Sequence, residues 1–296
     1  NVARWYDYWR ERPGTGTRVS SGGVNIIFSD SNTHYRGAEN YRRSGEVDAM
    51  RLPKDGFWAH QVMWDGWVDT ERPGIHIIGH WNYAPGVKKN VDVVSSAERV
   101  ELFLNGRSLG EGAQTNRFLF TFTNVLWQTG VLRAVGLDAK GTKLCETEKQ
   151  TASEATGLRL TLMTAAGGLK ADGADVALIE VEVVDAQGRR CPTNLNIVDF
   201  ELSGPAEWRG GIAQGPDNFI LSKQMPVECG VNRVLVRSTA KPGKITVTAK
   251  SDGLKSASVE IAAQPVSVTD GLAVAFPDAG QPCRLQRGPT PDGPSF

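Results

Sequence analysis

The sequence has no surplus of charge of either sign. Its 296 residues include 33 Lys and Arg against 33 Asp and Glu, so the formal net charge is zero at pH 7. Proteins whose main partner is nucleic acid or an anionic membrane need a basic excess to meet phosphate groups. No apolar run approaches the roughly 20 residues of a membrane span. We therefore expect neither a nucleic-acid partner nor a membrane-spanning protein.

Cysteine is scarce, and the four cysteines (Cys145, Cys191, Cys229 and Cys283) are far apart. No CxxC pair or His/Cys cluster occurs, which argues against a zinc or iron–sulfur site. We expect buried free thiols, with a disulfide as the alternative. The sequence also lacks GxSxG, P-loop, HExxH and dinucleotide fingerprints. No metal or cofactor is therefore expected.

The N-terminal segment differs in character from the rest of the chain. All four histidines and six of the eight tryptophans fall within the first 81 residues. Apolar residues at helical spacing predict one helix from Val2 to Trp9, ended by Pro13 and Gly14, and another after Pro53 that reaches Trp64. Between them, the apolar run at residues 23–28 suits a strand buried on both faces, as in a (β/α) barrel.

From about residue 90 to 263 the sequence changes to short alternating runs separated by turn residues, a pattern typical of all-β domains. Asn105 and Gly106 predict a type I′ hairpin turn. Two sets of residues are expected to face a core: Phe118, Phe120 and Phe122, and Ile179, Val181 and Val183. We divide the chain into four parts: residues 1–65, a β-sandwich at 66–152, a second at 153–263, and a proline-rich linker or truncated module at 264–296.

Candidate chemistry is concentrated in the polar loop at residues 29–51, which is rich in Asp, Glu, Arg and His. Loops that follow barrel strands build the active sites of barrels. The simpler interpretation is a solvated loop with surface ion pairs. His76 and His80 alternate as on a strand, too far apart to share a metal at ~3.3 Å per residue. For Trp64, Trp67 and Trp81, we favour packing between domains over a sugar-binding platform.

Several stretches resemble family 2 glycoside hydrolases, which include β-galactosidases and β-glucuronidases. Gly22-Gly23 with the run that ends at Asp30, GEVDAMRLPK at residues 45–54 and the helix that reaches Trp64 resemble the last strand and closing helix of their catalytic barrel. HIIGHWNY and VVSSAERVELFLNGRSLG are similar to the immunoglobulin-like domain that follows the barrel. GKITVTAKSDGLKSASVEI resembles the invasin-like modules appended to these enzymes.

The resemblance implies a mainly β chain: two antiparallel immunoglobulin-like β-sandwiches preceded by a terminal fragment of a (β/α)8 barrel. It implies substrate-binding roles at the barrel mouth for Asp30, His34, Arg42 and Arg43. The family's two catalytic glutamates would lie upstream of Asn1, so no catalytic residue is expected in this chain. Two departures stand out: Ile26 replaces the usual tryptophan, and Arg42, Arg43 and Ser44 replace the asparagine–lysine pair of β-glucuronidases.

We therefore expect the C-terminal portion of a retaining glycoside hydrolase, most simply a β-galactosidase, inactive by itself. The resemblance implies an oligosaccharide or glycoside substrate, homo-oligomerisation or docking with the missing barrel, and a periplasmic or extracellular location. Two alternatives stay open. One is a non-catalytic β-sandwich module that binds carbohydrate or protein. The other is an independent enzyme that uses Asp30 with Glu39 or Glu46.

Overall fold

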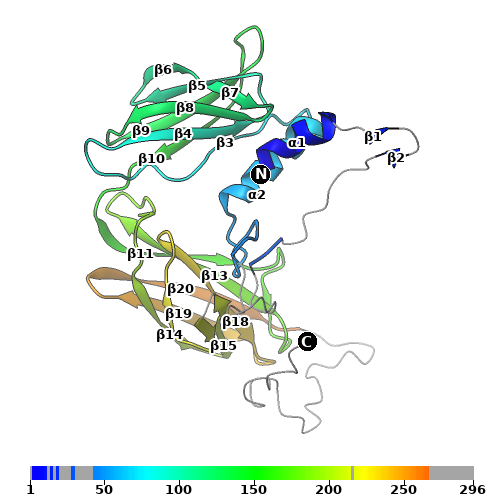
Figure 1. Ribbon diagram of the computed structural model, residues 1–296. Coiled ribbons are helices and arrows are strands. Elements are labelled where there is room, and N and C mark those ends of the chain that lie inside the picture. Colours follow the sequence, from blue (N-terminus) through cyan, green and yellow to red (C-terminus); the bar gives the residue numbers. More distant parts are fainter. Residues whose placement is uncertain are drawn as a thin grey trace, which may run out of the picture.

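The computed structural model describes residues 2–11, 14–15, 18–19, 28–30, 43–214 and 217–266. Two β domains lie at opposite ends of the molecule, and the N-terminal segment runs along one side between them (Figure 1). The prediction of a mainly β chain with antiparallel sheets is confirmed. The immunoglobulin-like character of both domains stays a prediction.

The described part of the N-terminal segment contains two helices, a two-stranded ribbon and a short piece of extended chain. The helices are α1 (Val2–Glu11) and α2 (Asp55–Trp67), and the ribbon pairs β1 (Gly14–Thr15) with β2 (Arg18–Val19). Both helices were predicted from their apolar spacing. The ring of Tyr6 on α1 lies 5.0 Å from the rings of both Trp67 and Phe118. Aromatic contacts therefore attach α1 to α2 and to the first β domain.

The first β domain is a sandwich of two four-stranded antiparallel sheets. One sheet has the order β10 (Lys143–Gln150), β9 (Val131–Leu137), β5 (Arg99–Leu104) and β6 (Arg107–Glu111). The other has the order β3 (Ile75–Ile77), β4 (Lys88–Ser95), β8 (Leu119–Leu126) and β7 (Ala113–Asn116). The predicted turn between β5 and β6 is confirmed, because φ is +52° at Asn105 and +80° at Gly106.

The core of this sandwich is built from alternate residues of its strands. Phe120 and Phe122 of β8 pack with Val91 and Val93 of β4. Phe118 is buried as predicted, but its ring lies against Tyr6 of α1. Phe118, which directly precedes β8, therefore contacts helix α1.

The second β domain is larger. Five strands form one sheet, in the order β16 (Asp217–Ile220), β15 (Ala206–Gln214), β18 (Val231–Ser238), β13 (Val176–Asp185) and β11 (Ala155–Met163). Four more follow as β20 (Leu254–Gln264), β19 (Gly243–Ser251), β14 (Ile197–Ser203) and β17 (Gln224–Pro226), and β12 (Leu169–Lys170) pairs with β20. A parallel contact between Gly157 and Lys255 joins the two sets of strands.

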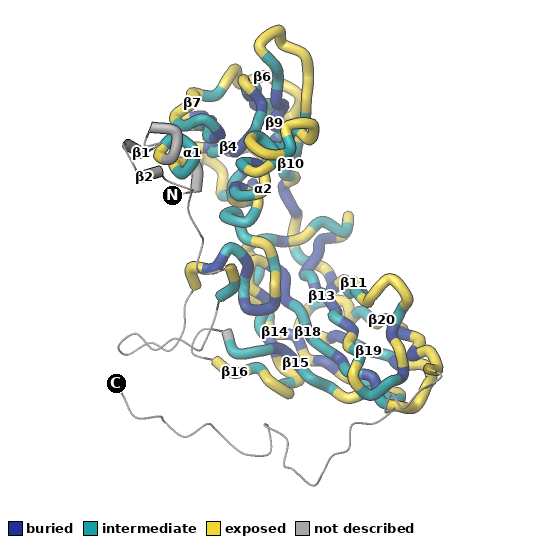
Figure 2. The backbone as a smooth tube through the Cα atoms, turned by 90° about the vertical axis from the view of Figure 1, so that its right-hand side faces the viewer, coloured by how far each residue is buried: buried dark blue, intermediate teal, exposed yellow. Residues whose placement is uncertain are grey.

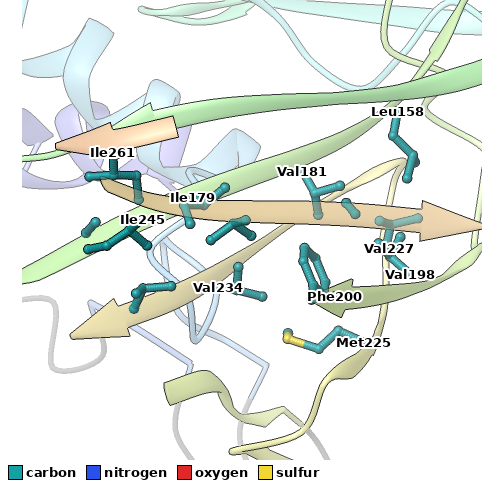
Figure 3. Close-up of a cluster of buried hydrophobic side chains, with 14 of the residues drawn as sticks. Leu158, Ile179, Val181, Val198, Phe200, Met225, Val227, Val234, Ile245 and Ile261 are labelled. Atoms are coloured by element: carbon teal, nitrogen blue, oxygen red, sulfur yellow. The ribbon is translucent and has the colours of Figure 1, made fainter. Parts of the chain in front are cut away.

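Alternation on β13 separates an apolar face from an acidic one. Ile179, Val181 and Val183 are fully buried, as predicted, and they pack in the core drawn in Figure 3. Glu180 and Glu182 lie between them in sequence and therefore point to the opposite face of the sheet. The alternation of buried and exposed chain is visible along the whole domain in Figure 2.

Among the described residues, Cys145, Cys191 and Cys229 are free thiols, and Cys283 lies outside the described part. Burial raises the pKa of the thiols of Cys145 and Cys191. The expectation of buried free thiols is met at Cys191, whereas the free thiol of Cys145 is half-buried and that of Cys229 is exposed. No helix in the described ranges is both long and apolar enough to cross a bilayer.

The connection between the β domains is held by the carboxylate of Asp185, at the end of β13. It accepts hydrogen bonds from the backbone N–H of Ser153 at 2.8 Å and from Nε of Arg189 at 2.7 Å. Backbone N–H groups of Gln187 and Arg189 also donate to it. Burial alone would raise the pKa of Asp185, but these hydrogen bonds outweigh it and lower the pKa to about 2.

This pKa predicts acid-dependent stability. Because the folded-state pKa lies below the unfolded value of 3.8, ionised Asp185 stabilises the fold above about pH 4. The contribution, on the order of 2 kcal/mol, is lost as pH falls toward 2. In urea titrations at pH 7, the free energy of unfolding of Asp185→Asn should be lower than that of the native chain. This difference in free energy should become smaller below pH 4. The exposed Asp252→Asn serves as control. An equal gap at pH 7 and pH 2 would contradict this assignment.

Candidate functional site

Asp30 lies where the extended chain at residues 28–30 meets a short hairpin formed by residues 46–54. Ser29 pairs in parallel with Val47, and Val47 pairs antiparallel with Pro53. The backbone N–H of Asp30 donates to the carbonyl of Val47 at 3.0 Å, and the N–H of Val47 donates to the carbonyl of Phe28 at 3.0 Å. Val47 therefore sits between two extended segments, and its pairing places Asp30 at the end of this small sheet.

The carboxylate of Asp30 is engaged by Lys54, the residue just before α2. Nζ of Lys54 lies 2.7 Å from Oδ1 and 2.6 Å from Oδ2 of Asp30, and it also donates to the carbonyl of Arg43 at 3.1 Å. An ammonium group has three protons, so these contacts use its donors fully. The Asp30 side chain is only 14% exposed. In this partly buried setting the ion pair is stronger than an exposed one.

Gly45 completes the environment of Asp30. Its backbone N–H donates to Oδ1 of Asp30 at 2.9 Å. A Cβ atom at this position would lie 2.3 Å from the backbone nitrogen of Asp30 and 2.7 Å from the carbonyl oxygen of Val47. Only glycine fits where these two backbone segments approach so closely. Counting the described residues alone, these three contacts leave one acceptor position on Oδ2 of Asp30, enough for a single hydroxyl group.

The short hairpin is closed by the side chain of Asp48. Its Oδ1 accepts from the N–H of Leu52 at 2.7 Å, and its backbone N–H donates to the carbonyl of Leu52 at 2.9 Å. Burial raises the pKa of Asp48, while hydrogen bonds from the backbone oppose the rise. At the tip, Arg51 has φ of +67°, and its guanidinium donates to Oγ of Ser29.

The structure brings together some of the predicted site residues. Asp30 and Arg43 meet through Lys54, although Arg43 contributes its backbone carbonyl and its side chain is exposed. His34 and Arg42 lie outside the described residues. Their predicted roles at the barrel mouth, and that of Arg43, stay predictions.

Other sequence-based candidates also fall partly outside the described residues. Glu39, Ile26 and most of the predicted strand at residues 23–28 lie outside, and only Phe28 of that strand is described. Oε2 of Glu46 lies 2.9 Å from Nδ1 of His60 on α2. Glu46 thus faces the helix, while Asp30 faces Lys54 on the other flank of the hairpin.

One of the remaining histidines, His76, attaches α2 of the N-terminal segment to the first β domain. Nε2 of His76 lies 2.9 Å from Oδ1 of Asp55, and the His76 ring stacks on Trp58 of α2 at 5.5 Å. Burial alone would raise the pKa of Asp55, but the contact with His76 outweighs it and the pKa is lowered. The prediction that one strand carries both His76 and His80 is wrong for His80. Strand β3 ends at Ile77, and His80 follows a turn at Gly79.

The tryptophans named as packing residues have different environments. Trp81 is buried in the core of the first β domain, and its Nε1 donates to the carbonyl of Gln128 at 3.0 Å. Trp64 and Trp67 of α2 are 60% and 48% exposed. Trp81 therefore packs inside one domain and not between domains as predicted, whereas α2 presents Trp64 and Trp67 at the surface.

Lys54 is the principal site residue that sequence reasoning missed. Its partner Asp30 lies 24 residues earlier, and no local pattern links the two. The available signal was Gly45, since a glycine between a polar loop and an apolar hairpin suggests close backbone approach. Within the described ranges, no group of three or more His, Cys, Asp or Glu side chains could hold a metal ion.

Family models match both β domains. The model for the glycoside hydrolase family 2 C-terminal domain 5 matches residues 160–260, within the second β domain. A model described as a domain of unknown function matches residues 86–145, within the first.

Two curated relatives cover most of the chain. A β-glucuronidase of Formosa agariphila is 43% identical over 93% of this chain and 28% of its own length. A β-galactosidase of Bacteroides ovatus is 30% identical over 74% of this chain and 25% of its own length. The chain thus spans little more than a quarter of these relatives. The expected resemblance is confirmed for the family, and the more similar of the two carries the name β-glucuronidase.

Solved structures of longer chains contain the same arrangement. A family 2 β-glucuronidase superposes with a TM-score of 0.81 at 41% identity, over 93% of this chain and 28% of that one. A β-glycosidase from Bacteroides vulgatus superposes with a TM-score of 0.70 at 25% identity, over 80% of this chain and 30% of that one. The chain therefore belongs to family 2 of the glycoside hydrolases, with the sequence and fold of the C-terminal part of those enzymes.

Proposed function

We propose that this chain completes the catalytic barrel of a retaining family 2 glycosidase and attaches two accessory β domains to it. Residues 1–65 would close the barrel, residues 66–152 and 153–263 would form the accessory domains, and residues 264–296 would lead onward. The observation that carries the proposal is the match to a whole β-glucuronidase structure over 93% of this chain. The two reacting carboxylates would come from the rest of the barrel.

The chain's own contribution to catalysis would be the placement of Asp30. A retaining glycosidase uses one carboxylic acid to protonate the leaving oxygen and one carboxylate, about 5 Å away, to attack the anomeric carbon. Residues that hold sugar hydroxyls orient the substrate for this attack. Asp30 suits that role because Lys54 and Gly45 fix its carboxylate and the described part of the chain leaves one acceptor position on Oδ2. In this role it binds and orients the sugar and transfers no proton.

A β-glucuronide is the substrate class that we propose first. It is supported by the higher identity to the Formosa agariphila β-glucuronidase, 43% against 30% for the β-galactosidase. The sugar carboxylate of a glucuronide needs a cationic partner. Arg42 and Arg43 are adjacent cations on the segment that leads into Gly45, and they offer such a partner.

A β-galactoside is the second candidate. It is favoured by the replacement of the asparagine–lysine pair of β-glucuronidases by Arg42, Arg43 and Ser44. The only lysine that follows in this part of the chain before α2 is Lys54, and its ammonium group is already committed to Asp30 and Arg43. A neutral sugar would need only hydroxyl contacts, which Asp30 can supply.

These candidates are separated by assaying the full-length parent enzyme on aryl β-glucuronide and aryl β-galactoside. We expect kcat/KM to be larger for the glucuronide by tenfold or more, because a charged hydrogen bond contributes about 1.5–3 kcal/mol. A preference for the galactoside would support the second candidate. Hydrolysis of neither, by folded enzyme, would contradict both and favour a non-catalytic binding module.

The role of Asp30 is tested by substitution in the same parent enzyme. Asp30→Ala removes the acceptor for the sugar, and Lys54→Met removes the group that holds it, so both should lower kcat/KM by tenfold or more. The matched control is Lys143→Met, since Lys143 pairs at 2.6 Å with Glu146 in the first β domain. If folded Asp30→Ala and Lys54→Met both have normal kinetics, the simpler interpretation of residues 29–51 as a solvated surface loop would be favoured.

A further inference from the structure

One side chain of the second β domain reaches the short hairpin of the N-terminal segment. Nη1 of Arg233, on β18, donates to the carbonyl of Arg51 at 2.8 Å and approaches that of Met50 at 3.4 Å. These residues are 182 and 183 positions apart in sequence. The contact therefore joins two parts of the molecule that the chain itself connects only through the whole first β domain.

Hydrogen bonds to Glu180 orient the guanidinium of Arg233 toward the hairpin. The two residues are direct partners in the antiparallel pairing of β18 with β13. Nε and Nη2 of Arg233 donate to Oε2 of Glu180 at 3.0 and 2.8 Å, and the two side chains are only 13% and 20% exposed. Because the guanidinium is planar and rigid, fixing two of its nitrogens sets the direction of the third. That third nitrogen points at the hairpin carbonyls.

The hairpin tip has a conformation that benefits from such a partner. Arg51 adopts a left-handed φ of +67°, a backbone conformation that residues other than glycine rarely adopt. Met50 and Ala49 are buried. A charged donor binds a carbonyl oxygen more strongly than a neutral donor does. Arg233 provides that donor at the strained residue.

The tip is coupled to Asp30 through a few short connections. The Arg51 guanidinium donates to Oγ of Ser29, the neighbour of Asp30. The backbone N–H of Lys54 donates to the carbonyl of Glu46 at 3.0 Å, so the hairpin base also carries the lysine that holds Asp30. A shift of the tip would therefore move both residues of the Asp30–Lys54 ion pair.

We propose that Arg233 is a positioning residue, by which the second β domain holds the short hairpin and, through it, the carboxylate of Asp30. This inference rests on the proposed function in one respect, namely that Asp30 contacts the sugar. It assigns the accessory domain a role in substrate binding without any contact to the substrate.

The same sheet contains a matched control. Arg159 on β11 is the direct partner of Glu182 on β13, and its Nε and Nη2 donate to Oε2 of Glu182 at 2.9 and 2.6 Å. Its third nitrogen donates to the carbonyl of Gly188, within its own domain. Arg159→Met therefore removes an equivalent Arg–Glu pair without removing a hairpin contact.

The first measurement is hydrogen exchange on the 296-residue chain. Arg233→Met should accelerate exchange of the hydrogen-bonded amides of Val47 and Lys54 by tenfold or more, because the hairpin opens more readily without its clamp. Arg233→Lys should restore part of the protection, and Arg159→Met should leave these amides unchanged. Unchanged β13 and β18 amides report that each variant is folded. Unaltered hairpin protection in folded Arg233→Met would overturn the proposal.

The second measurement is the kinetics of the full-length parent with an aryl glycoside. Arg233→Met should lower kcat/KM by fivefold or more, with partial recovery in Arg233→Lys and normal values in Arg159→Met. Suppose that Arg233→Met accelerates exchange in the hairpin and that Asp30→Ala lowers kcat/KM. If Arg233→Met then leaves kcat/KM unchanged, the positioning role of Arg233 is wrong. If Arg233→Met accelerates exchange in the hairpin but neither Arg233→Met nor Asp30→Ala affects kcat/KM, Arg233 does hold the hairpin and the proposed role of Asp30 is wrong.

Discussion

The ion pair between Asp30 and Lys54 is the interaction on which the arrangement of the N-terminal segment depends. It joins the end of an extended strand to the start of α2, with oxygen–nitrogen distances of 2.6 and 2.7 Å. The pair is tolerated in its partly buried position because the N–H of Gly45 and the carbonyl of Arg43 each add a hydrogen bond to one of the partners. Without it, a carboxylate and an ammonium group would each be left partly buried and unpaired.

The two β domains support this ion pair from opposite sides. The first holds α2 through His76 against Asp55, and it holds α1 through the ring of Phe118 beside Tyr6. The second holds the short hairpin, through Arg233 on the carbonyl of Arg51. Lys54 lies between these two attachments, at the junction of hairpin and helix. The two β domains thus act as a frame for one short stretch of chain.

Local patterns predicted the elements well, because strand alternation, helical spacing and turn residues act over a few positions. The buried set on β13, the turn at Asn105 and the helix after Pro53 are of this kind. The contacts at the site are not local: Lys54 meets Asp30 across 24 residues, and Arg233 meets Arg51 across 182. Alternation showed that Glu180 points away from the core, but it could not show that another segment covers that face.

The central claim is that Asp30 is held by Lys54 and Gly45 at the rim of a sugar-binding pocket. A crystal structure of the full-length parent enzyme with a bound glycoside or a substrate-mimicking inhibitor tests it most directly. The account predicts that Asp30 keeps its contacts with Lys54 and Gly45 and that Oδ2 accepts a hydroxyl of the sugar within about 3.2 Å. A sugar bound elsewhere, with Asp30 buried behind the barrel wall or turned to solvent, would contradict it.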